Sequence, residues 1–553
     1  MSESSSKTAP SSESSSRLYI QYLLCDRMAV GKILRDFSAW TSAHGIPHIG
    51  SAQNNCLRIF WGVIFFASTC MFIFQMVLLI QKYTSYDVTV QTELKFEERP
   101  FPTVTLCNLN PYVNNTVHLN KEISNLMNAY SAQIRKGDSS NEDVGNKWGF
   151  REMNDSIAVQ AKAREHLLYL GRSMSEETRE RMSYELKVIN GNYDRGFVLD
   201  CAFNTKPCNI SIRTLGVPDT GDFVETDDPI YGKCFTFNFN ATKISSRAGP
   251  LYGLRLLAVS NQDEYLPLTE SAGIRVAIHG ANDQPFPDAF GYNAAAGFTT
   301  SFGIKYIKTV RLTAPYGNCT DKHEDIEYFY KQPDGSRGNF QVEGCFRSCY
   351  QKYVILNCSC ADPRFPLPDA IKTEDGKDLS SLAYCDTFNT DQRKCVSAFS
   401  SGVGTSFNVV QKCSCPQPCT ESTYAVTVST ALWPSDVYTP PDCKVDQGNN
   451  FWGEGRESCT EWYKENTMLI EVFYERMNYQ LLSESEAYTF VNLISDMGGQ
   501  LGLWMGISVI TMIEFLSLFI LLCMYCCSRK NMNDGPPEPE VRQDSPFDGK
   551  QYE

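Results

Sequence analysis

Two long apolar stretches lie near the two ends of the chain. The first runs from Ile59 to Gln81 without a charged residue, and in the second Glu514 is the only charge between Asp496 and Arg529. A helix that crosses a bilayer needs about 20 predominantly apolar residues, so both stretches are long enough. The pattern predicts two transmembrane helices, at residues 59–81 and 493–527. A buried carboxylate such as Glu514 is expected to face water or a partner rather than lipid.

The segment between the predicted spans carries shorter patterns of both kinds. Residues 156–188 alternate apolar and charged positions at helical spacing, which predicts a helical hairpin. Ser173 and Glu176 have the spacing of a capping box at the start of its second helix. Cysteines three and four residues apart from aromatics predict a short disulfide-held helix at residues 346–356.

Two other segments have the alternation of β-strands. Residues 235–239 and 273–279 are rich in aromatic and β-branched side chains at a period of two. The fold class is therefore an α+β membrane protein, with several subdomains packed around one sheet in the segment from residue 82 to 492.

Flanking charges predict the orientation. Lys32, Arg35 and Arg58 precede the first stretch, and Arg529 and Lys530 follow the second. The positive-inside rule then places residues 1–58 and 528–553 in the cytosol and residues 82–492 outside the cell. The start of the chain is polar and Ser-rich, so the first span is expected to act as the insertion signal. The Pro-rich, acidic tail is predicted to be disordered.

Glycosylation sequons and cysteines agree with this orientation. Sixteen of the 22 cysteines lie between Cys107 and Cys459, which predicts up to eight disulfides in an oxidising compartment. Their spacings lack the paired CxxC and His pattern of structural zinc sites, so we expect no metal. The N-x-Ser/Thr sequons all lie between the predicted spans, at Asn114, Asn154, Asn209, Asn240, Asn318 and Asn357.

The formal net charge is −14. Basic and acidic residues nearly cancel at the two ends, so the excess of acids lies between the spans. Such a surface concentrates cations and steers cationic ligands, although a soluble glycosylated surface is an equally good explanation for most of these charges.

Six separated motifs resemble one known family, from about Phe37 to Phe515. They are the His44-Gly45 pair, the segment Phe101–Pro111 around Cys107, Gly232–Asn238 around Cys234, the block from Gly273 to Cys319, the cysteine cluster Cys413–Cys419, and Gly506-Ile507-Ser508. In this order they resemble the epithelial sodium channel, degenerin and acid-sensing channel family.

The resemblance implies a plasma-membrane homotrimer that conducts Na⁺, needs no cofactor and is not an enzyme. Gly506, Ile507 and Ser508 would be the selectivity filter, because short side chains expose carbonyls that replace the water around Na⁺. Standing alone, a Gly-x-Ser sequence in a membrane helix is more often a close packing contact. Asp496 and Glu514 would form acidic rings that favour cations. The family often has an acid where this chain has Ser517, so permeability ratios do not carry over.

Other positions match family sites for blockage and gating. Gly502 matches the site of amiloride, a cationic pore blocker. Ser495 matches the position where bulky substitutions hold family channels open. His44 and Gly45 match a re-entrant loop beneath the pore that affects gating; a titrating role for His44 is not implied.

The resemblance also implies disulfide partners, and it leaves Cys443 and Cys459 to pair by elimination. The implied pairs are Cys107 with Cys234, Cys201 with Cys208, Cys319 with Cys419, Cys345 with Cys415, Cys349 with Cys413, Cys358 with Cys395, and Cys360 with Cys385.

Three kinds of gating occur in the family: by protons, by small neuropeptides, and constitutive opening after proteolysis. The chain lacks a furin site in the region of its predicted hairpin and a Pro-Pro-x-Tyr signal in its tail, which disfavours the last. The overall residue pattern between Asn190 and Cys208 and the acidic exterior resemble those of the invertebrate branch that is gated by FMRFamide-like RF-amide peptides. We expect gating by an extracellular amidated peptide, with acid sensing as the alternative.

Two other classes fit less well. An ATP-gated receptor channel would need a basic phosphate site, which this exterior lacks, and an ectoenzyme would need a catalytic constellation. No Gly-x-Ser-x-Gly or His-Glu-x-x-His sequence occurs, although a triad assembled from distant residues leaves no such signature.

Overall fold

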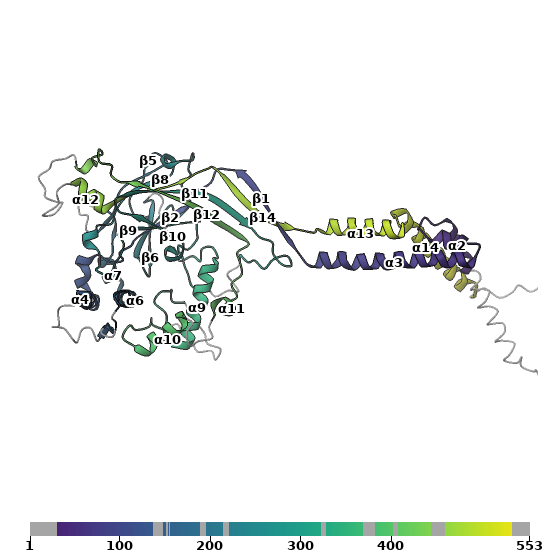
Figure 1. The fold of residues 1–553 in the computed structure, drawn as a ribbon, viewed down its shortest axis with the longest axis horizontal. Helices are drawn as coiled ribbons and strands as arrows, with labels where there is room; N and C mark the ends of the chain where they lie inside the picture. The colour runs from purple at the N-terminus through teal and green to yellow at the C-terminus, as the bar shows by residue number, and fades with distance from the viewer. Residues whose placement is uncertain are drawn as a thin grey trace, which may run out of the picture. The chain divides into compact units, whose positions relative to one another are not determined.

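A computed structural model describes residues 30–135, 147–150, 153, 155–188, 195–213, 220–321, 328–368, 382–401, 408–443 and 459–533. The chain folds into two units, and each is described by itself (Figure 1). The helical unit contains the two ends of the chain, up to Val88 and from Glu486. The sheet unit contains Thr89–Ser485.

The helical unit contains a short helix α2 (Ile46–Ser51), a long helix α3 (Asn55–Thr84), and two helices from the other end of the sequence, α13 (Phe490–Met505) and α14 (Val509–Asn533). Residues 30–40 are also helical. Helix α13 packs along α3 (Figure 1). Among the described residues, α3 alone is long and apolar enough to cross a membrane, and it extends beyond the predicted 59–81 at both ends.

The second apolar stretch differs from its prediction. Instead of one helix over 493–527, it forms α13 and α14, which are bent by 74° at a break of three residues. Together the two helices satisfy the length and composition of one span. Helix α14 also continues past residue 527 into the segment predicted to be a disordered tail.

The sheet unit contains two sheets, where the sequence predicts one. The larger has nine strands. Its order is β1 (Val88–Phe96), β14 (Asn478–Glu486), β11 (Phe298–Val310), β13 (Thr467–Tyr474), β8 (Leu254–Val259), β4 (Gly196–Phe203) and β3 (Glu185–Lys187), with β12 (Thr420–Leu432) paired to β11 and β5 (Lys206–Pro207) paired to β4. Strand β11 pairs in parallel with both β13 and β14.

The smaller sheet has five antiparallel strands, in the order β10 (Gly291–Ala295), β9 (Gly273–His279), β2 (Thr103–Asn108), β7 (Gly232–Phe237) and β6 (Phe223–Asp228). Both predicted strands are present here, as β7 and β9. One buried cluster takes side chains from both sheets, for example Leu106 and Phe235 from the smaller and Leu256 and Phe302 from the larger. Burial of such side chains contributes about 1.5–3 kcal/mol each, so this shared core holds the two sheets together.

Helices cover the rest of the sheet unit. The predicted hairpin forms as α6 (Ser156–Ser173) and α7 (Glu176–Met182), but the cap of α7 is Ser175, whose side chain accepts from the Thr178 N–H, and not Ser173. The other elements are α4 (Lys121–Arg135), α8 (Pro287–Phe290), α9 (Val342–Cys358), α10 (Thr390–Ser401), α11 (Val409–Lys412), α12 (Cys459–Asn466) and the 3₁₀ turns Asn114–Leu119, Pro250–Tyr252, Gln262–Glu264 and Pro441–Cys443. Helix α9 contains the helix predicted for residues 346–356.

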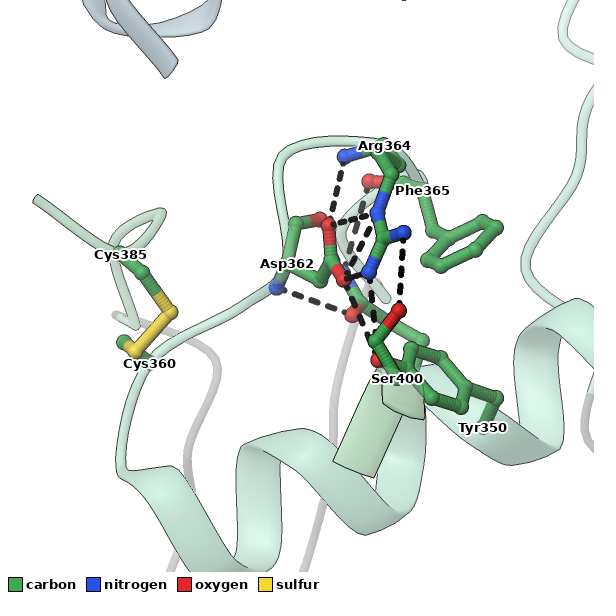
Figure 2. A network of polar contacts seen from close by, with 8 residues as sticks. Tyr350, Cys360, Asp362, Arg364, Phe365, Cys385 and Ser400 are labelled. Carbon is green, nitrogen blue, oxygen red and sulfur yellow. Dashed lines mark hydrogen bonds and ion pairs between the residues drawn. A yellow bond between two sulfur atoms is a disulfide. The ribbon is translucent and has the colours of Figure 1, made fainter. Parts of the chain in front are cut away.

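An ion pair between a buried carboxylate and a half-buried arginine fixes the chain between α9 and α10 (Figure 2). The Asp362 side chain is fully buried and lies 2.5 Å from Nη2 of Arg364. Tyr350 donates to Asp362, and Arg364 reaches the Ser400 hydroxyl at 3.3 Å, so the pair is hydrogen-bonded on several sides. The Cys360–Cys385 disulfide lies beside it. A buried carboxylate is tolerated when it is paired and its polar atoms are satisfied in this way.

Eight disulfides hold the sheet unit, and their pairing is the one that the resemblance and elimination give. They join Cys107 to Cys234, Cys201 to Cys208, Cys319 to Cys419, Cys345 to Cys415, Cys349 to Cys413, Cys358 to Cys395, Cys360 to Cys385, and Cys443 to Cys459. Five of the sequon asparagines are exposed in this unit, and Asn154 lies outside the described residues.

Candidate functional site

The break between α13 and α14 is formed by the three residues predicted to be the selectivity filter. Gly506 ends α13 with φ 63° and ψ 24°, a left-handed conformation that glycine adopts without steric cost. Its N–H donates to the Gly502 carbonyl at 3.0 Å, and the Ile507 N–H reaches the Leu501 carbonyl at 3.4 Å. These two bonds are typical of a helix that ends at a glycine. Gly506 therefore stops the helix within an apolar sequence that would otherwise continue it.

Ser508 starts the next helix. Its hydroxyl accepts from the Thr511 N–H at 3.4 Å, while the Thr511 hydroxyl accepts from the Ser508 N–H at 3.2 Å. Each side chain thus satisfies a backbone donor of the other residue, as in a capping box. The sequence prediction assigned Ser508 to ion selection and did not anticipate this capping contact.

The loop formed by residues 41–45 packs against the break. The His44 N–H donates to the Met505 carbonyl at 3.1 Å, which satisfies one of the carbonyls left without a helical partner at the end of α13. The His44 ring lies so close to Gly506 that a Cβ atom at position 506 would be 2.1 Å from ring atoms. Gly45 has φ 87°, and a Cβ there would be 3.0 Å from the Phe65 ring. Gly506 is therefore required by conformation and by space, and Gly45 by its conformation.

Glu514 holds the same loop from the first part of α14. Its Oε2 accepts from the Thr41 hydroxyl at 2.9 Å, from the Ser42 N–H at 2.8 Å and from the Ser42 hydroxyl at 3.2 Å. The Ser42 hydroxyl also lies 2.6 Å from that of Thr511, which is fully buried. The partner of this carboxylate is thus the 41–45 loop of its own chain.

Sequence reasoning missed Thr41, Ser42 and Thr511. A signal was present in each case: Thr511 is a polar residue three positions after Ser508, and Thr41 and Ser42 lie three and two positions before His44. The structure brings His44, Gly45, Gly506 and Glu514 together, and we call these residues with Thr41, Ser42 and Thr511 the loop–break cluster.

The remaining predicted residues lie on α13, before the break. Asp496 is exposed, and its Oδ2 accepts from the Tyr488 hydroxyl at 2.6 Å. Ser495 and Gly502 are also exposed and are seven positions apart, so they share one side of the helix. A Cβ added at Gly502 would meet no atom of the chain within 4 Å, and the same holds for Gly498 and Gly499. This side of α13 is open to a ligand or to another subunit.

Comparisons with known proteins cover both units. The profile of the family described as amiloride-sensitive sodium channel matches residues 37–518. Degenerin-like protein asic-2 of Caenorhabditis elegans is 31% identical over 533 residues, which cover 93% of this chain and 90% of that protein. Degenerin mec-10 of the same organism is 29% identical over 643 residues, which cover 88% and 83%. Degenerin unc-8 is 39% identical over 381 residues, or 68% of this chain and 44% of that protein. The matched region includes the whole loop–break cluster.

Proposed function

Because the chain belongs to the amiloride-sensitive sodium channel family, we propose that it is a sodium-selective, amiloride-blocked cation channel that works as a trimer in the plasma membrane. The family consists of membrane ion channels and not of enzymes. In this proposal, α3 and the bent pair of α13 and α14 cross the membrane, and both termini are cytosolic. Na⁺ is the permeant ion, and no cofactor takes part.

The observation that carries the proposal is the glycine-terminated break within the second apolar stretch. A helix that ends at depth in a membrane presents carbonyls with partial negative charge, which favour a cation. Irregular backbone is tolerated there when it lines a cavity or is covered by protein. The 41–45 loop supplies such cover on one side of the break. Three copies of Gly506, Ile507 and Ser508 around an axis would give a narrow ring of carbonyl and hydroxyl oxygens.

The exposed side of α13 is assigned to the outer part of the pore in this proposal. Asp496 would form an acidic ring at the mouth, and Gly502 would leave room for amiloride. Glu514 would add negative charge below the break, where its contacts with the 41–45 loop also link that loop to α14.

Bulky substitutions at Ser495 are expected to produce a channel that leaks without a stimulus. In the proposed trimer a large side chain on the open face of α13 would wedge between helices and prevent closure. We expect Ser495→Phe to raise the unstimulated amiloride-sensitive current at least several-fold, with Ser495→Ala as the small-residue control. A Ser495→Phe channel that reaches the surface and stays silent at rest would argue against this placement.

For gating we propose an extracellular, cationic amidated peptide of the RF-amide type. The support is the excess of acidic residues in the segment between the two predicted spans. This excess attracts cationic ligands by long-range electrostatics. Proton gating is the second candidate, and one observation favours it. Burial raises the pKa of Asp228 to about 6, so this carboxyl in the sheet unit would take up a proton as the pH falls through mildly acidic values.

Expression of the full chain in oocytes tests both candidates. We expect an amiloride-sensitive inward current during perfusion with Phe-Met-Arg-Phe-amide at pH 7.4, and no such current in uninjected cells. Raising the ionic strength should slow activation more than it changes the maximal current, because salt screens exposed charges over about 10 Å at 0.1 M. Current evoked by pH 5 alone, and lost in Asp228→Asn, would favour the proton-gated candidate instead.

A further inference from the structure

A ligand-sized pocket lies within the sheet unit, between strand β9, the paired strands β11 and β12, and the segment that leads into α9. Its volume is about 1000 Å³, at the upper end of the range of about 300–1,000 Å³ that is usual for small-ligand sites. Aromatic side chains make up much of its wall: Phe286, Phe290, Tyr292, Tyr306, Phe340 and Tyr424. Phe290 is 61% exposed, so an aromatic ring is available at the surface of the pocket.

Two carboxylates in the wall have no cationic partner in the part of the chain that the structure describes. Asp283 accepts from the Asn339 amide at 2.7 Å and from the Gly280 N–H at 3.0 Å. Asp321 accepts from the Cys419 and Thr420 N–H groups, at 2.9 and 3.2 Å. All these donors are neutral. Burial raises the pKa of Asp283, because its charged form is partly removed from water. A bound cation would offset this cost.

The other charged groups of the wall are already paired. Glu421 lies 2.7 Å from Arg311, and Glu343 lies 2.6 Å from Arg347. Arg99, the wall's one arginine or lysine among the described residues, is 3.4 Å from Glu97. Burial lowers the pKa of His279, which also lines the pocket, to about 4, so this ring is neutral. The carboxylates left for a ligand are therefore Asp283 and Asp321.

We propose that this pocket, which we call the aromatic–acidic pocket, binds the activating ligand, with a guanidinium or ammonium group at Asp283 and Asp321 and an aromatic ring against Phe290 and its aromatic neighbours. The inference rests on the proposed peptide gating and gives that ligand a location. Aromatic faces attract cations and also stack with aromatic rings, so one wall serves both ends of an Arg-Phe-amide.

Two residues of the pocket wall, Arg99 and Tyr306, link it to strand β14. The Arg99 guanidinium lies 4.3 Å from the centre of the Tyr306 ring, which lines the pocket, and 3.3 Å from that of Tyr479 in β14. Strand β14 precedes α13 in the chain, and β1, which lies next to β14 in the sheet, follows α3. A ligand that moves Tyr306 would thus disturb the Arg99 stack and the strand that precedes the pore helix.

Calorimetric titration of the purified full-length channel with Phe-Met-Arg-Phe-amide tests the location directly. We expect Asp283→Asn to weaken binding about tenfold or more, the usual loss for a hydrogen bond to a charged group. The analogue with Gln in place of Arg should bind weakly to the wild type and lose little further in Asp283→Asn. Phe290→Ala, which removes an exposed ring, should also weaken binding. Asp391→Asn on α10, outside the pocket, is the matched control and should leave binding unchanged.

The outcomes separate the pocket from the gating proposal. Binding that depends on Asp283 and Phe290 but evokes no current would uphold the pocket and overturn peptide gating. Peptide-evoked current and binding that are unchanged in both variants would uphold peptide gating and overturn the pocket. A wild-type channel that binds no peptide would overturn the pocket's assignment to this ligand class.

Discussion

Gly506→Ala is expected to reduce the amiloride-sensitive sodium current at least tenfold at equal surface expression. A residue other than glycine costs about 1–2 kcal/mol in the left-handed conformation that Gly506 adopts. The new Cβ would also lie 2.1 Å from the His44 ring, so the ring or the break must move. Movement of the break displaces the backbone between α13 and α14, and movement of the ring disturbs the 41–45 loop that packs against it. The current and the surface expression of the full chain in oocytes are the measurements.

Two further variants separate the causes. Gly498→Ala is the matched control, because a Cβ there meets no atom of the chain, and its current should resemble the wild type. The double variant Gly506→Ala with His44→Ala removes the clash but keeps the backbone strain. Its current should therefore lie between that of Gly506→Ala alone and that of the wild type. Wild-type current in Gly506→Ala would contradict the conformational role of this glycine.

Removal of the Glu514 carboxylate is the second large effect that we expect. Glu514→Ala leaves the Thr41 and Ser42 donors without their acceptor, and the current should fall about tenfold or more. Glu514→Gln keeps one acceptor oxygen without the charge and should give an intermediate current. Ser517→Ala is the control, because the Ser517 hydroxyl donates only to the Glu514 backbone carbonyl, within the helix.

Variants of the 41–45 loop distinguish two roles of Glu514: holding the loop by hydrogen bonds, or only supplying negative charge. Thr41→Val with Ser42→Ala removes two of the donors and leaves the carboxylate in place. If Glu514 acts by holding the loop, this pair should reproduce much of the Glu514→Gln effect, and the combination of all three changes should be less than additive. Full current in the double variant Thr41→Val with Ser42→Ala would show that Glu514 acts only through its negative charge.

Local patterns in the sequence predict local elements well. Strand β9 has the bounds Gly273–His279 that its alternating side chains predict, and α9 forms where cysteines and aromatics have helical spacing. The cap of α7 shows the limit of such patterns. Ser173 and Ser175 both precede the acidic first turn of that helix, and the choice between them depends on where α6 ends.

These local patterns could not predict contacts between residues that are far apart in the sequence. The larger sheet depends on pairing such as that of β11 with β13 and β14, across more than a hundred residues of sequence. The break at Gly506 lies in an apolar run whose hydrophobicity predicts a continuous helix. The contact between Glu514 and Ser42 joins residues 472 positions apart, which spacing cannot indicate. For the disulfides, the resemblance to a family supplied partners that cysteine spacing leaves open.

In the proposed channel, ions are selected at Gly506, Ile507 and Ser508. The most direct measurement is the reversal potential of the amiloride-sensitive current when external Na⁺ is replaced by K⁺, for the wild type and for Ser508→Phe. We predict a large negative shift for the wild type, because Na⁺ is preferred, and a much smaller shift for Ser508→Phe, whose ring would displace the oxygens around the ion. Robust current with the wild-type shift in Ser508→Phe would contradict this account.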